Sequence, residues 1–130
     1  MTSDRRTLVF LTRPDGLAVR MAGSCALAAA AMGDRVDVFL LGEAVRAVVE
    51  GPGERAGAGA GERGGAGEPD DAAAALFRAR SAGTCRIFAC SQGIVDSGLD
   101  PAAAQEVLDA VVGWPTILEW TRGVADRFFF

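Results

Sequence analysis

The sequence predicts an α/β protein: a three-layer α/β/α sandwich around a mainly parallel five-stranded sheet. Two observations support this fold class: short, continuously apolar runs recur along the chain, and stretches with helical periodicity lie between them. Continuous apolar runs are typical of strands that are covered on both faces, as in a parallel sheet. A chain of 130 residues, half of them hydrophobic, can bury one core, so we expect a single domain over residues 1–130.

The first half of the chain is expected to alternate strictly between strand and helix. The elements are a strand at residues 7–11 (TLVFL), a helix at 17–32, a strand at 35–41 (RVDVFLL) and a short helix at 43–50. Gly33 is a suitable residue to end the first helix, and Gly51-Pro52 ends the second. Spacings of four, three and four residues predict the buried stripe of the first helix: Met21, Cys25, Ala28 and Met32.

Residues 51–68 interrupt this alternation with a segment of almost only Gly, Ala, Glu and Arg. The segment lacks apolar periodicity, so we expect a flexible surface loop inside the single domain. It contains a formal GxGxxG match at residues 59–64. Because no strand precedes the match and no helix opens on it, we do not interpret it as a dinucleotide-binding motif.

The second half is expected to continue the alternation to the C-terminal residues. The elements are a helix opened by Pro69, Asp70 and Asp71 and ended by Gly83, a strand at 85–90, a helical turn at 94–99, a helix from Asp100-Pro101 to about 109, a strand at 111–113, a helix at 117–122 and a strand at 127–130. The capping box of Thr116 and Glu119 supports the helix at 117–122. Phe128, Phe129 and Phe130 are expected to fill a buried or interfacial edge.

Cys90 is the strongest candidate for chemistry, because it lies where the 85–90 strand gives way to Ser91, Gln92 and Gly93. The carboxyl ends of parallel strands face the ligand crevice of an open α/β sheet. A thiol just before a helix also meets backbone N–H groups that favour its thiolate, so we expect a pKa below the 8.5 or so of free cysteine. The competing interpretation is a buried cysteine that behaves as a small apolar side chain.

Composition excludes several other classes of site. All 13 basic residues are Arg, and the chain contains no Lys and no His, so a phosphate-loop lysine, a Schiff base, a Cys-His pair and a His-ligated metal are excluded. No metal and no cofactor are predicted. The net charge of −4 argues against nucleic-acid binding, and no apolar run reaches membrane-spanning length. We therefore expect a cytoplasmic protein.

The three cysteines do not indicate a disulfide framework, because their number is odd. Cys85 and Cys90 begin and end the same predicted strand, which places them roughly 16 Å apart and at opposite edges of the sheet. Cys25 belongs to the predicted buried stripe of the first helix. Of the three thiols, we therefore expect Cys90 to be alkylated first in the folded protein.

Four pieces of the chain resemble the DsrE/TusD (DsrE/DsrF-like) family of small sulfur-relay proteins. They are the first strand with its long small-residue helix, residues 36–42, residues 86–91 together with 97–99, and residues 116–128, which begin with TILE and end with ADRF. The resemblance implies a flavodoxin-like fold and a persulfide carried on Cys90. It also implies sulfur donor and acceptor proteins as partners and a homo-oligomer, a trimer or a hexamer.

Three functions follow from these observations. The leading hypothesis is a sulfur carrier or sulfurtransferase-like protein whose Cys90 thiolate accepts and relays sulfane sulfur. Supporting residues on the same sheet edge are Arg13 beside the thiolate, Ser91, Gln92 and Gly93 as N–H donors, and Trp114 as a wall of the crevice or a core residue. The alternatives are a non-catalytic assembly or binding subunit with an inert Cys90, and a flavodoxin-like module that binds a small ligand.

Overall fold

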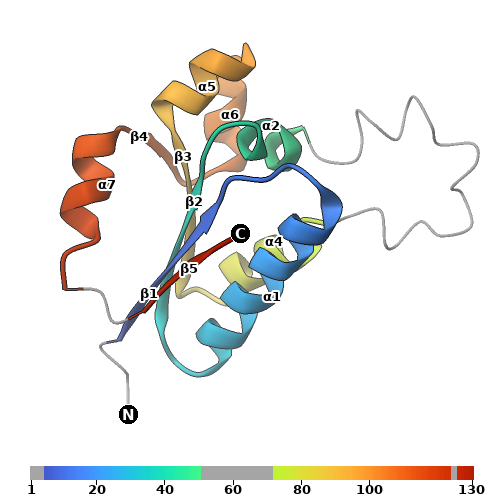
Figure 1. Cartoon of the computed structure of the whole chain (residues 1–130). Helices are drawn as coiled ribbons and strands as arrows, with labels where there is room; N and C mark the ends of the chain where they lie inside the picture. Colours follow the sequence, from blue (N-terminus) through green and yellow to red (C-terminus); the bar gives the residue numbers. More distant parts are fainter. Residues whose placement is uncertain (1–4, 51–71, 124–125) are drawn as a thin grey trace, which may run out of the picture.

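A computed structural model describes residues 5–50, 72–123 and 126–130 (Figure 1). Its sheet has five strands, all parallel, in the order β4-β3-β2-β1-β5, which confirms the predicted fold class. The strands are β1 (Arg6–Leu11), β2 (Arg35–Leu40), β3 (Cys85–Cys90), β4 (Ala110–Val112) and β5 (Asp126–Phe129). The helices are α1 (Gly16–Ala31), α2 (Ala44–Val49), α4 (Ala74–Ser81), α5 (Ser91–Ser97), α6 (Pro101–Val107) and α7 (Trp114–Trp120).

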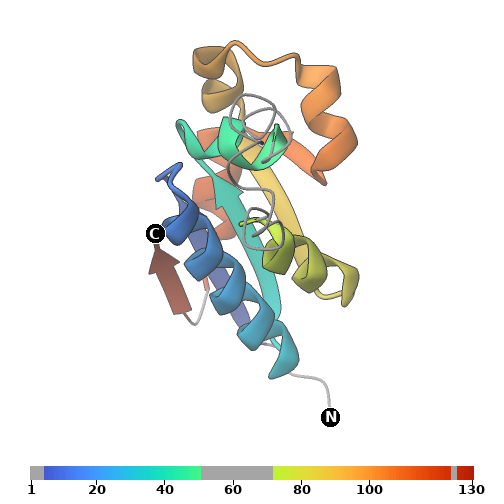
Figure 2. The ribbon, with the colours of Figure 1, turned by 90° about the vertical axis from the view of Figure 1, so that its right-hand side faces the viewer.

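The strand order explains which helix covers which face of the sheet. From β1 to β4 the chain steps across the sheet in one direction, and crossovers between parallel strands are right-handed, so their helices share one face. The chain then returns past β1 to add β5, and the helix of that return, α7, lies on the opposite face. Figures 1 and 2 show α1 and α4 together on one side of the sheet, and Figure 1 shows α7 on the other. We call these the broad face and the α7 face.

The broad face is built on very close packing of α1 against α4. A Cβ atom at Gly23 of α1 would lie 2.8 Å from the Cβ of Ala75 and 2.9 Å from the backbone nitrogen of Leu76. The residues of α1 that are buried here are Ala18, Val19, Ala22, Gly23 and Ala26. The predicted stripe is therefore wrong, because small side chains let the helices approach and the bulky Met21 and Met32 are exposed.

The α7 face is an aromatic layer. The rings of Phe10, Phe39 and Phe88 stack across three neighbouring strands with centroids 5.4 and 5.5 Å apart. Trp120 of α7 lies edge-on to Phe88 at 4.9 Å. A second core cluster, separate from that of the broad face, contains these residues together with Leu8, Cys90 and Ile117.

The ends of the helices agree with the sequence in part. Asp100 caps α6 by accepting a hydrogen bond from the Ala102 nitrogen at 3.2 Å, as predicted. The capping box at Thr116 is wrong: α7 begins at Trp114, with Gly113 as its N-cap and Pro115 in its first turn, where proline favours a helical start. α5 begins directly after β3, and α4 begins at Ala74. Residues 51–68 and the predicted helix start at 69–71 lie outside the described residues.

Candidate functional site

The carboxyl ends of β3 and β4 are where the topology of this sheet reverses. The chain leaves β3 into α5 toward the broad face, and it leaves the neighbouring β4 into α7 on the opposite face. In open α/β sheets, ligands bind at such a switch point, outside the carboxyl ends of the strands. Cys90, the last residue of β3, is paired in register with Val112 of β4 and therefore lies at this point.

Cys90 is buried beneath the α7 face rather than open to solvent. Its residue is 3% exposed, and it belongs to the same cluster as Phe88 and Ile117. The backbone of Cys90 has extended dihedral angles and forms the N-cap position of α5. The structure thus confirms the position of Cys90 at the strand end, whereas its thiol is covered in this conformation.

The three residues after Cys90 form the first turn of α5. Ser91 and Gln92 are exposed, and the Gln92 amide donates a hydrogen bond to the Asp96 carboxylate at 2.9 Å. Gly93 is buried, and a Cβ atom there would lie 2.9 Å from the Cγ2 of Val45 and 3.3 Å from the Gly42 nitrogen. Gly93 therefore lets α5 approach the start of α2 closely, which is a packing role that the sequence did not indicate.

Arg13 and Trp114 lie on the same sheet edge as Cys90, as predicted, and differ in their contacts. The Nε of Arg13 donates to Asp15 at 3.1 Å, and Asp15 caps α1 by accepting from the Ala18 nitrogen at 3.0 Å. That backbone hydrogen bond and the Arg13 guanidinium hold the pKa of Asp15 below its ordinary value. β2 separates the strand before Arg13 from β3, a lateral distance of roughly 10 Å. Trp114 is half exposed at the start of α7.

The other two cysteines are poor thiolates for physical reasons. Cys85 begins β3 at the opposite end from Cys90 and is buried on the broad face. Burial, together with the carboxylates of Asp37 and Asp109, raises the pKa of the Cys85 thiol to about 12. Partial burial also raises the pKa of the Cys25 thiol. Neither thiol is ready to act as a nucleophile near neutral pH.

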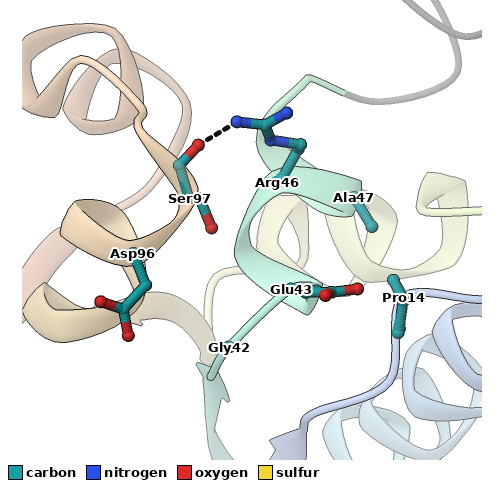
Figure 3. A pocket seen from close by; sticks show the side chains of 7 residues that line it. All are labelled: Pro14, Gly42, Glu43, Arg46, Ala47, Asp96 and Ser97. Carbon is teal, nitrogen blue, oxygen red and sulfur yellow. Dashed lines mark hydrogen bonds between the residues drawn. The ribbon is translucent and has the colours of Figure 1, made fainter.

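A cleft of about 660 Å³ opens on the same sheet edge but on the side of α2. Figure 3 shows the described residues that line it: Pro14, Gly42, Glu43, Arg46, Ala47, Asp96 and Ser97. Arg46 reaches across it from α2 and donates to the Ser97 carbonyl oxygen of α5 (Figure 3). Sequence reasoning missed this cleft, although Gly42 and Glu43 at a strand end were a signal of the edge. Cys90 is not among its lining residues.

Within residues 5–50, 72–123 and 126–130, no three His, Cys, Asp or Glu side chains are placed to hold a metal ion together. In the same residues, no helix has both the length and the apolar character that crossing a membrane requires.

A comparison with curated proteins found no match. The model of the DsrE/DsrF-like family matches residues 5–129, which is nearly the whole chain and includes every described strand. The chain therefore belongs to the DsrE/DsrF-like family.

Proposed function

We propose that this protein is a sulfur carrier that accepts a sulfane sulfur on Cys90 as a persulfide and passes it to a partner protein. The observation that carries the proposal is the place of Cys90: it is the last residue of β3, at the switch point where α5 and α7 diverge. Membership of the DsrE/DsrF-like family, which the resemblance described above links to sulfur relay, supports the chemistry. The raised pKa values of Cys25 and Cys85 make those two thiols weaker candidates.

The relay consists of two thiol exchanges with no net oxidation. In the first, the Cys90 thiolate attacks the outer sulfur of a donor persulfide, a new S–S bond forms, and the donor cysteine leaves as a thiolate. In the second, an acceptor thiolate attacks the outer sulfur on Cys90, and Cys90 leaves as a thiolate. The exposed residues Ser91 and Gln92 and the half-exposed Trp114 border the edge at which both partners approach. Such a relay belongs in the cytoplasm, where thiols stay reduced.

The test is the intact mass of the folded protein after incubation with a low-molecular-weight persulfide donor. The wild type is expected to gain the mass of one sulfur atom, and Cys90→Ser is expected to gain none. Cys25→Ser and Cys85→Ala are the matched controls and should load as the wild type does. Loading of Cys90→Ser at the wild-type level contradicts the proposal.

A homo-oligomer, a trimer or hexamer, is part of the same proposal. β5 forms an edge of the described sheet, and its Phe128 and Phe129 are 41% and 70% exposed. Exposed aromatic side chains on an unpaired strand edge favour association with another protein surface. Light scattering should give a mass well above 13.4 kDa, and a monomer throughout the micromolar range would exclude the oligomer.

The burial of Cys90 supports a second candidate function, an assembly subunit in which the thiol is inert. A cysteine 3% exposed in an apolar cluster is also what a purely structural residue looks like. The mass experiment separates the two functions, because an inert Cys90 gains no sulfur in the native protein.

A further inference from the structure

Helix α7 lies along the outer side of β3, over the side chains that include Cys90. Alternate residues of β3 point to this face, namely Cys90, Phe88 and Arg86. Ile117, in the middle of α7, is buried in the cluster with Cys90 and Phe88. Trp120, at its end, lies against Phe88 and within 5.5 Å of the Arg86 guanidinium. The helix therefore runs from the Cys90 end of β3 back toward the start of that strand.

The attachment of α7 to the sheet is slight. Ile117 is the one buried residue among its seven, whereas Trp114 is 49% exposed and Leu118 is 58% exposed. A glycine lies just outside each end of the helix: Gly113 is its N-cap, and Gly123 has a φ of +74°. Elements with few buried apolar contacts open locally at a low free-energy cost.

A series of hydrogen bonds and cation–π contacts connects the C-terminal end of α7 to the sheet. The buried Asp37 of β2 accepts hydrogen bonds from Arg6 at 3.0 Å and from the Nε of Arg86 at 3.1 Å. The carboxylate thereby holds the Arg86 guanidinium 5.1 Å from the Phe88 ring and 5.5 Å from the Trp120 ring. Both distances lie within the range of a cation–π contact. The contacts from Asp37 to Arg86 and from Arg86 to Trp120 thus link β2, β3 and α7.

We propose that α7 is a lid over Cys90 and that Arg86, oriented by Asp37, is the positioning residue that holds the lid closed. Opening of α7 exposes the thiol to the donor and acceptor, and closing shields the thiol, or its persulfide, from other thiols. The lid deepens the proposed sulfur-carrier function and rests on it for its biological meaning. The physical part of the proposal, that Arg86 controls the local exposure of Cys90, is testable without any sulfur transfer.

The experiment measures alkylation of each cysteine in the folded protein by mass spectrometry of its peptides. Cys85 is the internal reference, because it lies on the same strand but points to the broad face. In Arg86→Gln, Asp37 keeps its hydrogen bond from Arg6, so the fold is expected to persist. Loss of the guanidinium from the two rings should raise the alkylation rate of Cys90 about tenfold. The rate of Cys85 should stay at its wild-type value.

Three further variants sharpen the assignment. Arg86→Lys keeps a cation but loses the planar fork, and it should give a Cys90 rate between those of the wild type and Arg86→Gln. Trp120→Phe changes the ring that the Arg86 guanidinium contacts, and it should raise the alkylation rate of Cys90 in the same way. Arg80→Gln is the matched control: Arg80 lies 5.1 Å over the Phe77 ring on α4, a cation–π contact on the broad face. It should leave the Cys90 rate unchanged.

The outcomes separate the lid from the proposed function. Equal acceleration of Cys85 and Cys90 in Arg86→Gln means global loosening and overturns the lid, and so does an unchanged Cys90 rate. If the selective acceleration occurs but Cys90 never gains sulfur from the donor, the lid stands and the sulfur-carrier function fails. If Cys90 gains sulfur in every Arg86 variant at the wild-type rate while its alkylation rate is also unchanged, the function stands and the lid fails.

Discussion

The two faces of the sheet are built in opposite ways. The broad face is covered by α1, α2, α4, α5 and α6, whose many buried small residues bring backbones close together. The α7 face is covered by one described helix with one fully buried residue, over a layer of aromatic rings. β3 supplies a cysteine to each face: Cys85 to the first and Cys90 to the second. The two cysteines lie five residues apart on one strand and have different surroundings. Opening of α7 therefore exposes Cys90 but not Cys85.

Gly23→Ala should have the largest effect, because it tests the tight packing of the broad face. The new Cβ would lie within 3 Å of the Ala75 Cβ and the Leu76 nitrogen, and a backbone atom cannot move aside cheaply. We expect a loss of about 3 kcal/mol in the free energy of unfolding measured in urea. Gly16→Ala is the control, because its Cβ would meet ordinary contacts at 3.6 and 3.9 Å. Equal stability of the two variants would show that α1 and α4 are not tightly packed.

Ile117→Ala should cost less, about 2 kcal/mol, which is the low end for a buried isoleucine. Ile117 is the one buried residue of α7, so the helix can shift to fill part of the space that the smaller side chain leaves. The loss should appear mainly as faster hydrogen exchange in α7 and faster alkylation of Cys90, with α1 and α4 protected as before. Leu118→Ala, one position along and exposed, should change stability by less than about 0.5 kcal/mol. Faster exchange throughout the molecule would show that the α7 face is not an independent unit.

Phe129→Leu should have a smaller effect at the margin of the α7 face. The Phe129 ring is stacked on Phe10 with centroids 4.9 Å apart and an interplanar angle of 9°. Replacing the ring removes the aromatic pair but keeps an apolar side chain, so we expect a loss of about 1 kcal/mol in thermal unfolding. Phe128→Leu, for which no such stacking partner is recorded among the described residues, is the control. A larger loss in the control would mean that the stack adds little.

Cys85→Ala should change the pH dependence of stability more than stability at neutral pH. The pKa of Cys85 is raised in the folded state to about 12, so the folded protein holds a proton that the unfolded chain releases above about 8.5. Stability therefore falls as pH rises through this window, and the alanine variant should show a shallower fall in Tm between roughly pH 8.5 and 10.5. Cys25→Ser should retain more of the wild-type slope. Parallel slopes for wild type and Cys85→Ala would contradict the raised pKa.

The sequence predicted the central strands well and the helix faces poorly. The apolar runs at residues 7–11, 35–41 and 85–90 agree with β1, β2 and β3 to within one residue at either end, because continuous burial leaves an unambiguous pattern. The stripe of α1 was wrong because alanine occupies both its buried and its exposed positions, so hydropathy gives almost no contrast between the faces. Close packing there selects for small size rather than for hydrophobicity.

The position of Cys90 at the end of a strand was predicted, whereas its burial was only the competing interpretation. That Cys90 ends a strand follows from the local sequence. Its burial under α7 follows from the strand order, since only the return of the chain past β1 sends α7 to the other face, and no local pattern encodes that order. Asp37 and Arg86 interrupt otherwise apolar strands, and a charge in a buried strand requires a partner. These two residues were therefore a signal in the sequence for the ion pair that they form.

The pairing of β5 with β1 also has a consequence for how the chain folds. Arg5 contacts Asp126 across 121 residues of sequence, and Phe130 exchanges backbone hydrogen bonds with Phe10 and Thr12. During synthesis, β1 to β4 emerge first, with one edge of β1 unpaired and the Phe10 ring missing its partner Phe129. Contacts of such high sequence separation form slowly, and an open edge invites pairing with other chains. Docking of β5 is thus the step that covers the open side of β1 and the Phe10 ring, and it leaves β5 as the edge strand of the completed sheet.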